Sequence, residues 1–349
     1  MTTASAAATP IPPDVLDEWL WDKGIGRLQS ALAPLAGGTQ NRMYTFVAGG
    51  RELVLRCGPE HPRPSSNEAL TREMRVLAAL AKTDVPHPAL AAACSDTGLI
   101  EGSVFYVMER VQGVNVRQSP AARHRDSTAV RREMGPQMAL TAASVAAVDP
   151  EAVGLGEFGK PDGFLERQVE RWRGELETHR SRPGDAGTDL PQVDEIGDWL
   201  DSNRPREWRR GLMHGDFHIA NVLFEESGSR VTAIVDWELA TVGDPFMDLG
   251  LMLAVWPSPR SRPLRGGLYD LDGLATPEAI VARYVDATGR DTRTLPWYVA
   301  LAAFKLAIVL EGTYARSLAG QADADLGLQL HATAQRLLHR ARESTAGDL

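Results

Sequence analysis

Three oxygen-bearing side chains have the types and spacing that phosphate chemistry requires. Asp216 lies within the segment LMHGDFHIANVLF (residues 212–224), Asn221 follows five residues later, and Asp236 follows the next apolar run. Phosphoryl transfer has a loose transition state, so its catalysts mainly position groups and neutralise charge. A carboxylate can orient the accepting hydroxyl and take its proton, and Mg²⁺ prefers carboxylate and amide oxygens. We therefore predict Asp216 as the base, and Asn221 with Asp236 as Mg²⁺ ligands.

The elements around these residues would bring the two metal ligands together. Two short strands, 222–224 and 232–235, bracket a polar turn, and this hairpin would place Asn221 beside Asp236. An Asp after an apolar strand is common, and the tripeptide HGD alone is a weak signal. The combination of HGDxxxxNVLF, IVDWE and GDPxxDL is far more specific. It favours a catalytic site over an ordinary polar loop.

The rest of the chain divides into a β-rich part and a helical part. Two β-prone runs, 43–47 and 52–56, are joined by Gly49-Gly50 and predict a hairpin. Helices are expected at 14–21, 27–32 and 67–81, with a further strand at 104–109. After Gly113 the pattern is mainly helical, with helices expected at 126–148, 164–179, 194–202, 277–288, 296–318 and 325–342. We predict an α+β, two-lobed fold: a tail at 1–13, a small lobe at 14–110 and a larger helical lobe at 111–349.

Composition narrows the function classes. A net charge of −9 and a pI near 5.5 argue against a general nucleic-acid binder. Two cysteines exclude a disulfide framework and fit a reducing, cytoplasmic location, and the N-terminus lacks the pattern of a secretory signal. The most apolar stretch, Tyr298 to Leu310, is interrupted by Lys305 and is too short for a membrane span. We expect a cytoplasmic protein, a monomer or homodimer, without a membrane partner.

The catalytic segment resembles the core of the aminoglycoside phosphotransferase family, which has the protein-kinase-like fold. The resemblance extends from about Leu35 to Leu338. It is closest to the phosphotransferase domains related to those fused to acyl-CoA dehydrogenases. The features supporting that subgroup are ELVLR at 52–56, the pair Arg171-Trp172, and DWELATVGDP at 236–245.

The resemblance implies a role for each residue of the catalytic segment. It makes Asp216 the base, Asn221 and Asp236 the Mg²⁺ ligands, and Asp248 a buried acceptor of hydrogen bonds from the catalytic-loop backbone. His214 belongs to the catalytic set, where we expect it to hold the loop in shape rather than to transfer protons. For Asp244 we prefer a local role, since Asp followed by Pro starts a helix well.

The resemblance also places a nucleotide, ATP or GTP, on the small lobe. Gly37, Gly38, Thr39 and Asn41 match the loop that covers the phosphates. Arg56 stands where many kinases have a phosphate-binding Lys, and Arg can bind phosphate bidentately. Glu73 is the expected partner of Arg56, with Glu68 as second choice. Met108, Glu109 and Arg110 would form the hinge, whose backbone would bind the base.

The acceptor is the least determined partner. Arg171, Trp172, Tyr314 and Arg316 are the candidates for lining its site. The resemblance implies either a hydroxyacyl-type metabolite or, as an alternative, an aminoglycoside or macrolide antibiotic. A catalytically inactive nucleotide-binding pseudokinase is a second alternative, kept open by the Arg at position 56. A protein kinase is not favoured, because an APE-like segment and a long activation loop are missing.

Overall fold

A computed structural model describes residues 9–35, 41–61, 64–181, 190–259 and 261–347. The chain forms two compact units, a small one of residues 1–112 with 233–240 and a large one of residues 113–232 with 241–349. The predicted lobe boundary at 110/111 lies two residues from the observed one. The prediction did not assign Ala233–Ala240, which contains Asp236, to the small unit. The predicted phosphate-loop residues Gly37, Gly38 and Thr39 lie outside the described residues.

The small unit is built on an antiparallel sheet with strand order β1-β2-β3-β5-β4. Its elements are α1 (Pro13–Asp22), β1 (Ala33–Pro34), β2 (Arg42–Ala48), β3 (Arg51–Cys57), α2 (Pro64–Leu80), β4 (Leu90–Cys94), β5 (Phe105–Glu109) and the short 3₁₀ helix η2 (Trp237–Leu239). The predicted hairpin is present, since Ala48 pairs with Arg51 across Gly49 and Gly50. Both glycines have positive φ, which a two-residue hairpin turn of this kind requires.

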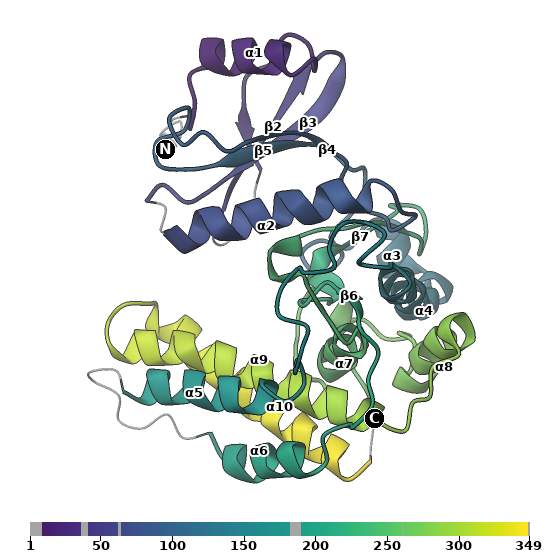
Figure 1. Ribbon diagram of the computed structural model, residues 1–349. Coiled ribbons are helices and arrows are strands. Elements are labelled where there is room, and N and C mark those ends of the chain that lie inside the picture. Colours follow the sequence, from purple (N-terminus) through teal and green to yellow (C-terminus); the bar gives the residue numbers. More distant parts are fainter. Residues whose placement is uncertain (1–8, 36–40, 62–63, 182–189, 260, 348–349) are drawn as a thin grey trace. The chain divides into compact units, whose positions relative to one another are not determined.

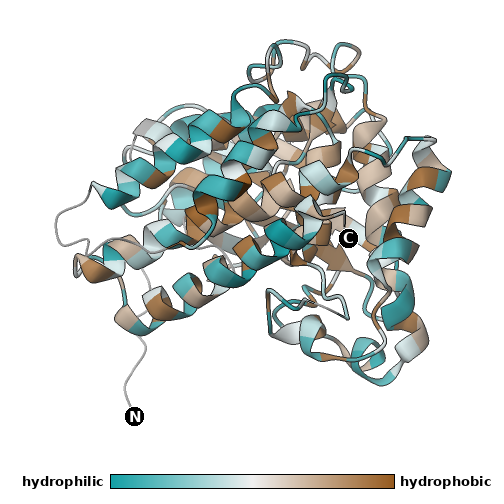
Figure 2. Cartoon of the chain, turned by 90° about the horizontal axis from the view of Figure 1, so that it is seen from below, coloured by the Kyte–Doolittle hydropathy of each residue, from teal (hydrophilic) through white to brown (hydrophobic). Residues whose placement is uncertain are grey.

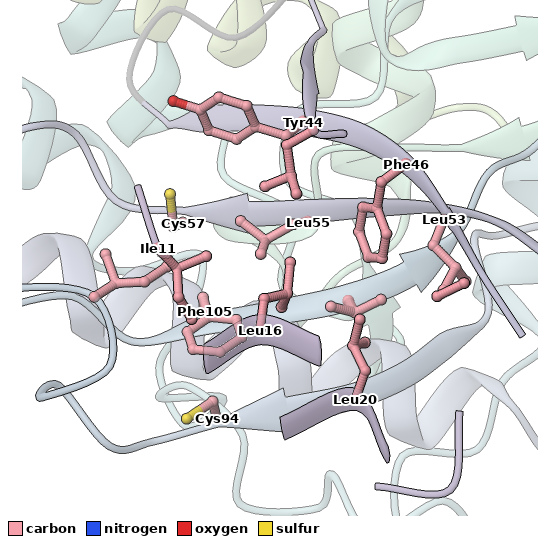
Figure 3. Close-up of a cluster of buried hydrophobic side chains, with 14 of the residues drawn as sticks. Ile11, Leu16, Leu20, Tyr44, Phe46, Leu53, Leu55, Cys57, Cys94 and Phe105 are labelled. Carbon is pink, nitrogen blue, oxygen red and sulfur yellow. The ribbon is translucent and has the colours of Figure 1, made fainter. Parts of the chain in front are cut away.

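Alternation along the strands separates the two faces of this sheet. Leu53, Leu55 and Cys57 of β3 lie in an apolar cluster with Leu16 and Leu20 of α1 (Figure 3). The sheet lies between α1 and α2 in Figure 1. Because side chains alternate along a strand, Arg56 points to the face opposite α1. This is how β3 brings a cation toward α2.

Three expectations for the small unit were wrong. Residues 27–32 are not helical: Leu28 forms a β-bridge with Ala48, and Gln29 N donates to Val47 O, because the segment pairs with the end of β2 that β1 does not reach. Strand β4 was missed, since its Ala-rich sequence lacks β-branched residues. Ile11, assigned to a terminal tail, is fully buried in the apolar cluster, and α1 begins at Pro13.

The large unit is mainly helical. Its helices are α3 (Ala122–Asp126), α4 (Thr128–Ala146), α5 (Gln168–Arg180), α6 (Val193–Ser202), α7 (Phe246–Val255), α8 (Pro277–Thr288), α9 (Leu295–Leu318) and α10 (Ala324–Thr345), with 3₁₀ helices η1 (Ile219–Asn221) and η3 (Gly267–Asp270). Two short sheets pair β6 (Gly211–Met213) with β9 (Thr241–Gly243), and β7 (Val222–Phe224) with β8 (Val231–Ile234). Figure 2 shows helices that are hydrophilic on one side and hydrophobic on the other.

Helix α9 is central to the large unit and packs against α5, α6, α7 and α10. Among the described residues, it is the one helix long and apolar enough to cross a membrane. The expectation that no stretch is long and apolar enough for a membrane span was therefore wrong, as judged by length and composition. However, 72% of the most apolar window is buried within the unit, which is typical of a core helix.

Candidate active site

The loop 214–216, which contains the predicted base Asp216, is held by side chains from two helices. Asp248 of α7 accepts hydrogen bonds from the backbone N–H groups of His214 at 2.6 Å and Gly215 at 2.8 Å. Lys305 of α9 donates to the carbonyl of Gly215 at 3.0 Å. Gly215 has φ of +81°, a conformation that favours glycine. The loop is therefore held at two N–H groups and one carbonyl by side chains of α7 and α9.

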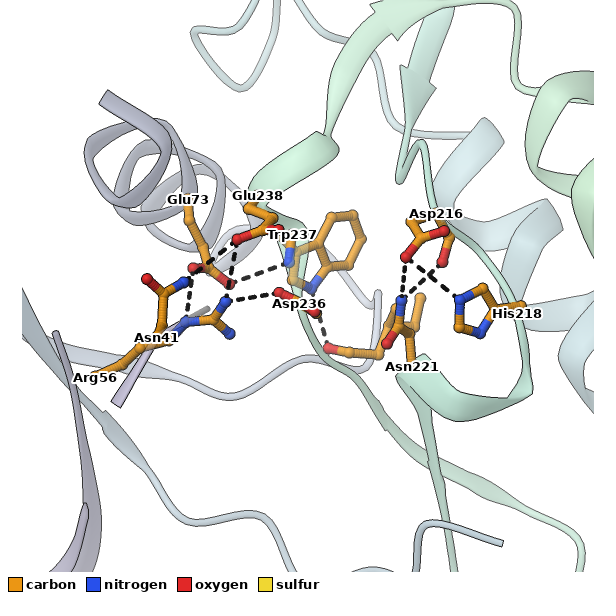
Figure 4. A network of polar contacts seen from close by, with 10 residues as sticks. Asn41, Arg56, Glu73, Asp216, His218, Asn221, Asp236, Trp237 and Glu238 are labelled. Atoms are coloured by element: carbon orange, nitrogen blue, oxygen red, sulfur yellow. Dashed lines mark hydrogen bonds and ion pairs between the residues drawn. The ribbon is translucent and has the colours of Figure 1, made fainter. Parts of the chain in front are cut away.

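The two carboxylate oxygens of Asp216 differ: Oδ2 has hydrogen-bond partners, and Oδ1 is available to a ligand. Asn221 Nδ2 donates to its Oδ2 at 2.9 Å, and His218 Nε2 lies 3.3 Å from the same atom (Figure 4). Its Oδ1 accepts no hydrogen bond from the described residues. Burial by itself raises the pKa of Asp216, but the contacts with His218 and the charge of Lys305 outweigh it and hold the pKa well below its ordinary value. Asp216 is thus a constant anion with a free acceptor atom.

Asp248 and His214 both form hydrogen bonds with the backbone of the loop 214–216. Both are buried. Burial raises the pKa of Asp248 to about 7, although the two backbone N–H groups and Lys305 act in the opposite direction. His214 Nδ1 accepts a hydrogen bond from the backbone N–H of Asp216 at 3.2 Å, which tightens the turn of the loop. Both contacts are of the kind that we expected from the resemblance.

Arg56 is the centre of the polar network of the small unit (Figure 4). Its guanidinium is buried and lies 3.3 Å from Glu73 Oε2, 2.7 Å from Asp236 Oδ1 and 3.5 Å from Glu238 Oε2. Asn41 Nδ2 also donates to Glu238 Oε2, at 3.3 Å. The structure thus pairs Arg56 with Glu73 rather than with Glu68. One fixed cation balances three carboxylates here.

The surroundings of Glu73 and Asp236 differ. Burial raises the pKa of Glu73 to about 7, although Arg56 lowers it, and its Oε1 accepts from the backbone N–H of Trp237 at 3.1 Å. Asp236 has a side chain that is 38% exposed and a φ of +69°. A positive φ in a residue other than glycine is uncommon and is found at functional sites. Asp236 is therefore the accessible carboxylate of the network.

The donor atoms fit a magnesium ion in type. Asn221 uses its Nδ2 to donate to the backbone O and Oδ2 of Asp216, so its Oδ1 is left for another partner. Asp236 offers a carboxylate, and both kinds of oxygen suit Mg²⁺. Within the described ranges, no three His, Cys, Asp or Glu side chains form a metal-binding group.

Two of the predicted acceptor residues lie close to Lys305, and two do not. The Arg171 guanidinium and the Lys305 ammonium lie 4.8 Å and 5.6 Å from the centroid of the Trp172 ring. The buried indole Nε1 of Trp172 has no hydrogen-bond partner in the described part of the chain. By contrast, Tyr314 stacks on His331, and Arg316 donates to Thr313. No contact described for Tyr314 or Arg316 joins them to the loop 214–216.

The predicted hinge residues are only partly available to a nucleotide base. The N–H of Glu109 donates to Ala89 O, and that of Arg110 donates to Glu52 O. The Glu109 carboxylate lies 3.3 Å from Arg51, and Met108 is buried in β5. Base binding through these two N–H groups would therefore require breaking existing bonds, and their role stays a prediction.

Sequence reasoning missed three members of the polar networks. His218 and Glu238 lie two residues from Asp216 and Asp236, so the motif HGDFH and the run DWE carried a signal for both. Lys305 interrupts the apolar stretch of α9, and that interruption was noted without assigning it a role. Its contact with Gly215 joins residues 90 positions apart and is decided by packing.

Comparisons with known proteins relate the whole chain to a family. The model of the phosphotransferase enzyme family (APH) matches residues 31–284. Acyl-CoA dehydrogenase family member 10 of Mus musculus is 32% identical over 329 residues, which are 90% of this chain and 29% of the mouse protein. The chain therefore spans less than a third of that relative.

Solved structures show the same fold. A Ralstonia eutropha protein provisionally named as an aminoglycoside phosphotransferase has a TM-score of 0.80 and 28% identity, covering 97% of this chain and 99% of that one. A thermostable mutant of aminoglycoside phosphotransferase APH(4)-Ia, in a ternary complex with ADP and hygromycin B, has a TM-score of 0.57 and 17% identity, covering 93% and 98%. The predicted two-lobed, protein-kinase-like α+β fold is confirmed, and the chain belongs to the aminoglycoside phosphotransferase (APH) family of phosphotransferase enzymes.

Proposed function

We propose that this protein transfers the γ-phosphoryl group of ATP or GTP to a hydroxyl group of a small molecule. The observation that carries the proposal is the Asp216 carboxylate, which is anionic, held through Oδ2 and open at Oδ1. The hydroxyl would donate to Oδ1, which orients its oxygen toward the phosphorus. A low pKa suits this task, because in a loose transition state the proton leaves late and positioning dominates.

A magnesium ion would be held by Asn221 Oδ1 and the Asp236 carboxylate. When bound, the ion neutralises charge on the phosphates of the donor. Arg56 lies 2.7 Å from Asp236, and its fork of N–H donors could hold a phosphate oxygen bidentately. The complete set of base, amide and carboxylate supports an active enzyme over a pseudokinase.

For the acceptor, we propose a hydroxyacyl-type metabolite or another neutral or anionic hydroxyl compound. Arg171 and Lys305 both lie against Trp172, and two cations disfavour a polycation at this place. The mouse relative is named as an acyl-CoA dehydrogenase, which agrees with a hydroxyacyl acceptor. An aminoglycoside is the second candidate, because the APH(4)-Ia complex contains hygromycin B.

We also propose a cytoplasmic location. Cys57 and Cys94 are buried thiols without a disulfide. They pair with Phe105 from opposite sides of β5, so a whole strand separates them. Their separation prevents a disulfide between them in any compartment, so the proposal rests on the low number of cysteines in the sequence.

The test is acceptor-stimulated release of ADP or GDP across hydroxylated metabolites and antibiotics, with Mg²⁺ present. Asp216→Asn should lower kcat at least about 100-fold while nucleotide affinity changes little. Asp286→Asn, an exposed Asp on α8, is the matched control and should behave as the wild type. If nucleotide binds but no acceptor stimulates release, the pseudokinase is favoured. Retention of full turnover by Asp216→Asn would exclude the assigned base.

A further inference from the structure

His218 links the catalytic carboxylate to the backbone of the metal-ligand segment. Its Nδ1 accepts a hydrogen bond from the backbone N–H of Ala220 at 3.2 Å, as the N-cap of η1. Its Nε2 lies 3.3 Å from Oδ2 of Asp216. Both ring nitrogens therefore have partners, one in the backbone and one in the proposed catalytic base.

The cap determines which nitrogen carries the proton. A backbone N–H can only donate, so Nδ1 must offer its lone pair. The proton of the ring is then on Nε2. An Nε2–H group next to a carboxylate oxygen is a donor, and it acts on the same Oδ2 that Asn221 holds. The N-cap thereby fixes the tautomer that Asp216 needs.

The segment around the ring is itself fixed. The carbonyl of His218 accepts from Asn221 N at 2.9 Å, and Asn115 Nδ2 donates to the carbonyl of Ala220 at 2.7 Å. The His218 side chain is 23% exposed, so the ring lies at the edge of the site without being free in solvent. These contacts hold the imidazole as a rigid support.

A carboxylate held by one donor can still turn, because the torsion about its Cβ–Cγ bond is broad and roughly two-fold. With Asn221 alone, either oxygen of Asp216 could take the held position at different angles. A second donor from another direction restricts that torsion. Oδ1 then keeps one direction, which is what alignment of an acceptor hydroxyl requires.

We propose that His218 is a positioning residue, whose Nε2–H orients the Asp216 carboxylate through Oδ2 and thereby leaves Oδ1 aimed at the acceptor hydroxyl. This inference rests on the proposed function of Asp216 as base. His218 then has two separate tasks: its Nδ1 caps η1, and its Nε2 orients Asp216.

Two substitutions separate these tasks. In His218→Asn, the amide oxygen can replace Nδ1 as the cap, but no donor reaches Asp216. In His218→Gln, the amide nitrogen can reach Asp216 while the cap is lost. We expect His218→Asn to lower kcat about 10- to 100-fold with little change in the KM for nucleotide or in stability. His218→Gln should recover most of kcat and lose stability. His339→Asn, at an exposed His on α10, serves as the surface control.

The kinetic assay uses ADP release with the best acceptor of the screen, or with water as acceptor when none is found. A purely structural role predicts the reverse order, with His218→Asn close to wild type and His218→Gln impaired. That order would overturn the inference. If wild type and Asp216→Asn release ADP equally with every acceptor and with water, the proposed function itself fails.

A measurement without turnover tests the tautomer. In protein labelled with ¹⁵N-histidine, long-range ¹H–¹⁵N spectra distinguish a protonated Nε2 from a protonated Nδ1. The signals that disappear in His218→Asn belong to His218. We expect the Nε2–H tautomer. A proton on Nδ1 would contradict the cap, and the inference would be refuted whatever the acceptor is.

Discussion

Replacing Arg56 by Met should destabilise the protein strongly and in a pH-dependent way. The Arg56 side chain is 9% exposed and that of Glu73 is 2% exposed, with 3.3 Å between Nε and Oε2. At that distance two unit charges attract by about 5 kcal/mol for an effective dielectric constant near 20. Removing one partner of a buried pair costs about 3–5 kcal/mol, because the other charge stays uncompensated. We expect a loss of this size at pH 8.

The pKa of Glu73 sets the sign of the pH dependence. Burial already raises it to about 7 with Arg56 present, against an ordinary value of 4.5. A raised pKa means that the folded state binds the proton more readily, so this group favours folding below about pH 4.5, and that contribution is lost as pH rises through 7. Without Arg56 the pKa of Glu73 rises further, so Arg56→Met keeps the proton on Glu73 at both pH values, whereas the wild type gives up most of it between pH 6 and pH 8. The loss in free energy of unfolding should then be about 1–2 kcal/mol smaller at pH 6 than at pH 8.

The assay is urea unfolding followed by circular dichroism at both pH values, with the slope m checked for constancy. Arg51→Met is the matched control: Arg51 is on the same strand and has the same 3.3 Å distance to its partner Glu109, but its side chain is 44% exposed. It should cost less than about 1 kcal/mol. Adding Glu73→Gln to Arg56→Met should restore stability at pH 8. Equal losses for the two Arg variants, or no pH dependence, would refute the reasoning.

Further substitutions test the packing and the loop. Gly250→Ala should cost at least about 2 kcal/mol, because its Cβ would lie 2.7 Å from the backbone oxygen of Tyr298; thermal unfolding measures this. Gly174→Ala, in a helix with open space at the Cβ position, should instead stabilise by about 0.5–1 kcal/mol, and a loss there would contradict the assignment. For Asp248, whose pKa is raised to about 7, protonation below that pH disrupts its two backbone bonds, so kcat should fall toward acid. Because the pKa of Asp248 is raised in the folded state, protonation of this group favours folding, and its contribution to the free energy of unfolding does not decrease as the pH falls. An Asp248→Asn variant should have a lower kcat at pH 8 and should no longer show the decrease of kcat toward acid. If that decrease persists unchanged in the variant, another group causes it.

Local sequence was sufficient where neighbouring residues make the structure. The Gly49-Gly50 hairpin was predicted because its turn needs positive φ at both positions. The five-residue spacing of Asp216 and Asn221 places their side chains in contact within one loop and η1. The same local reasoning failed at residues 27–32, where an apolar spacing suited to a helix is overridden by pairing with the edge of β2.

The sequence by itself predicted the chemistry, from a carboxylate, an amide and a second carboxylate at the spacings of Asp216, Asn221 and Asp236. Only the tertiary structure decided how these groups are held. Asp248 and Lys305 reach the loop from helices far along the chain, and Glu238 shares Arg56 with Asp236 through contacts about 180 residues apart in sequence. Such partners depend on which helix faces pack together, and packing is a property of the whole core rather than of any local pattern.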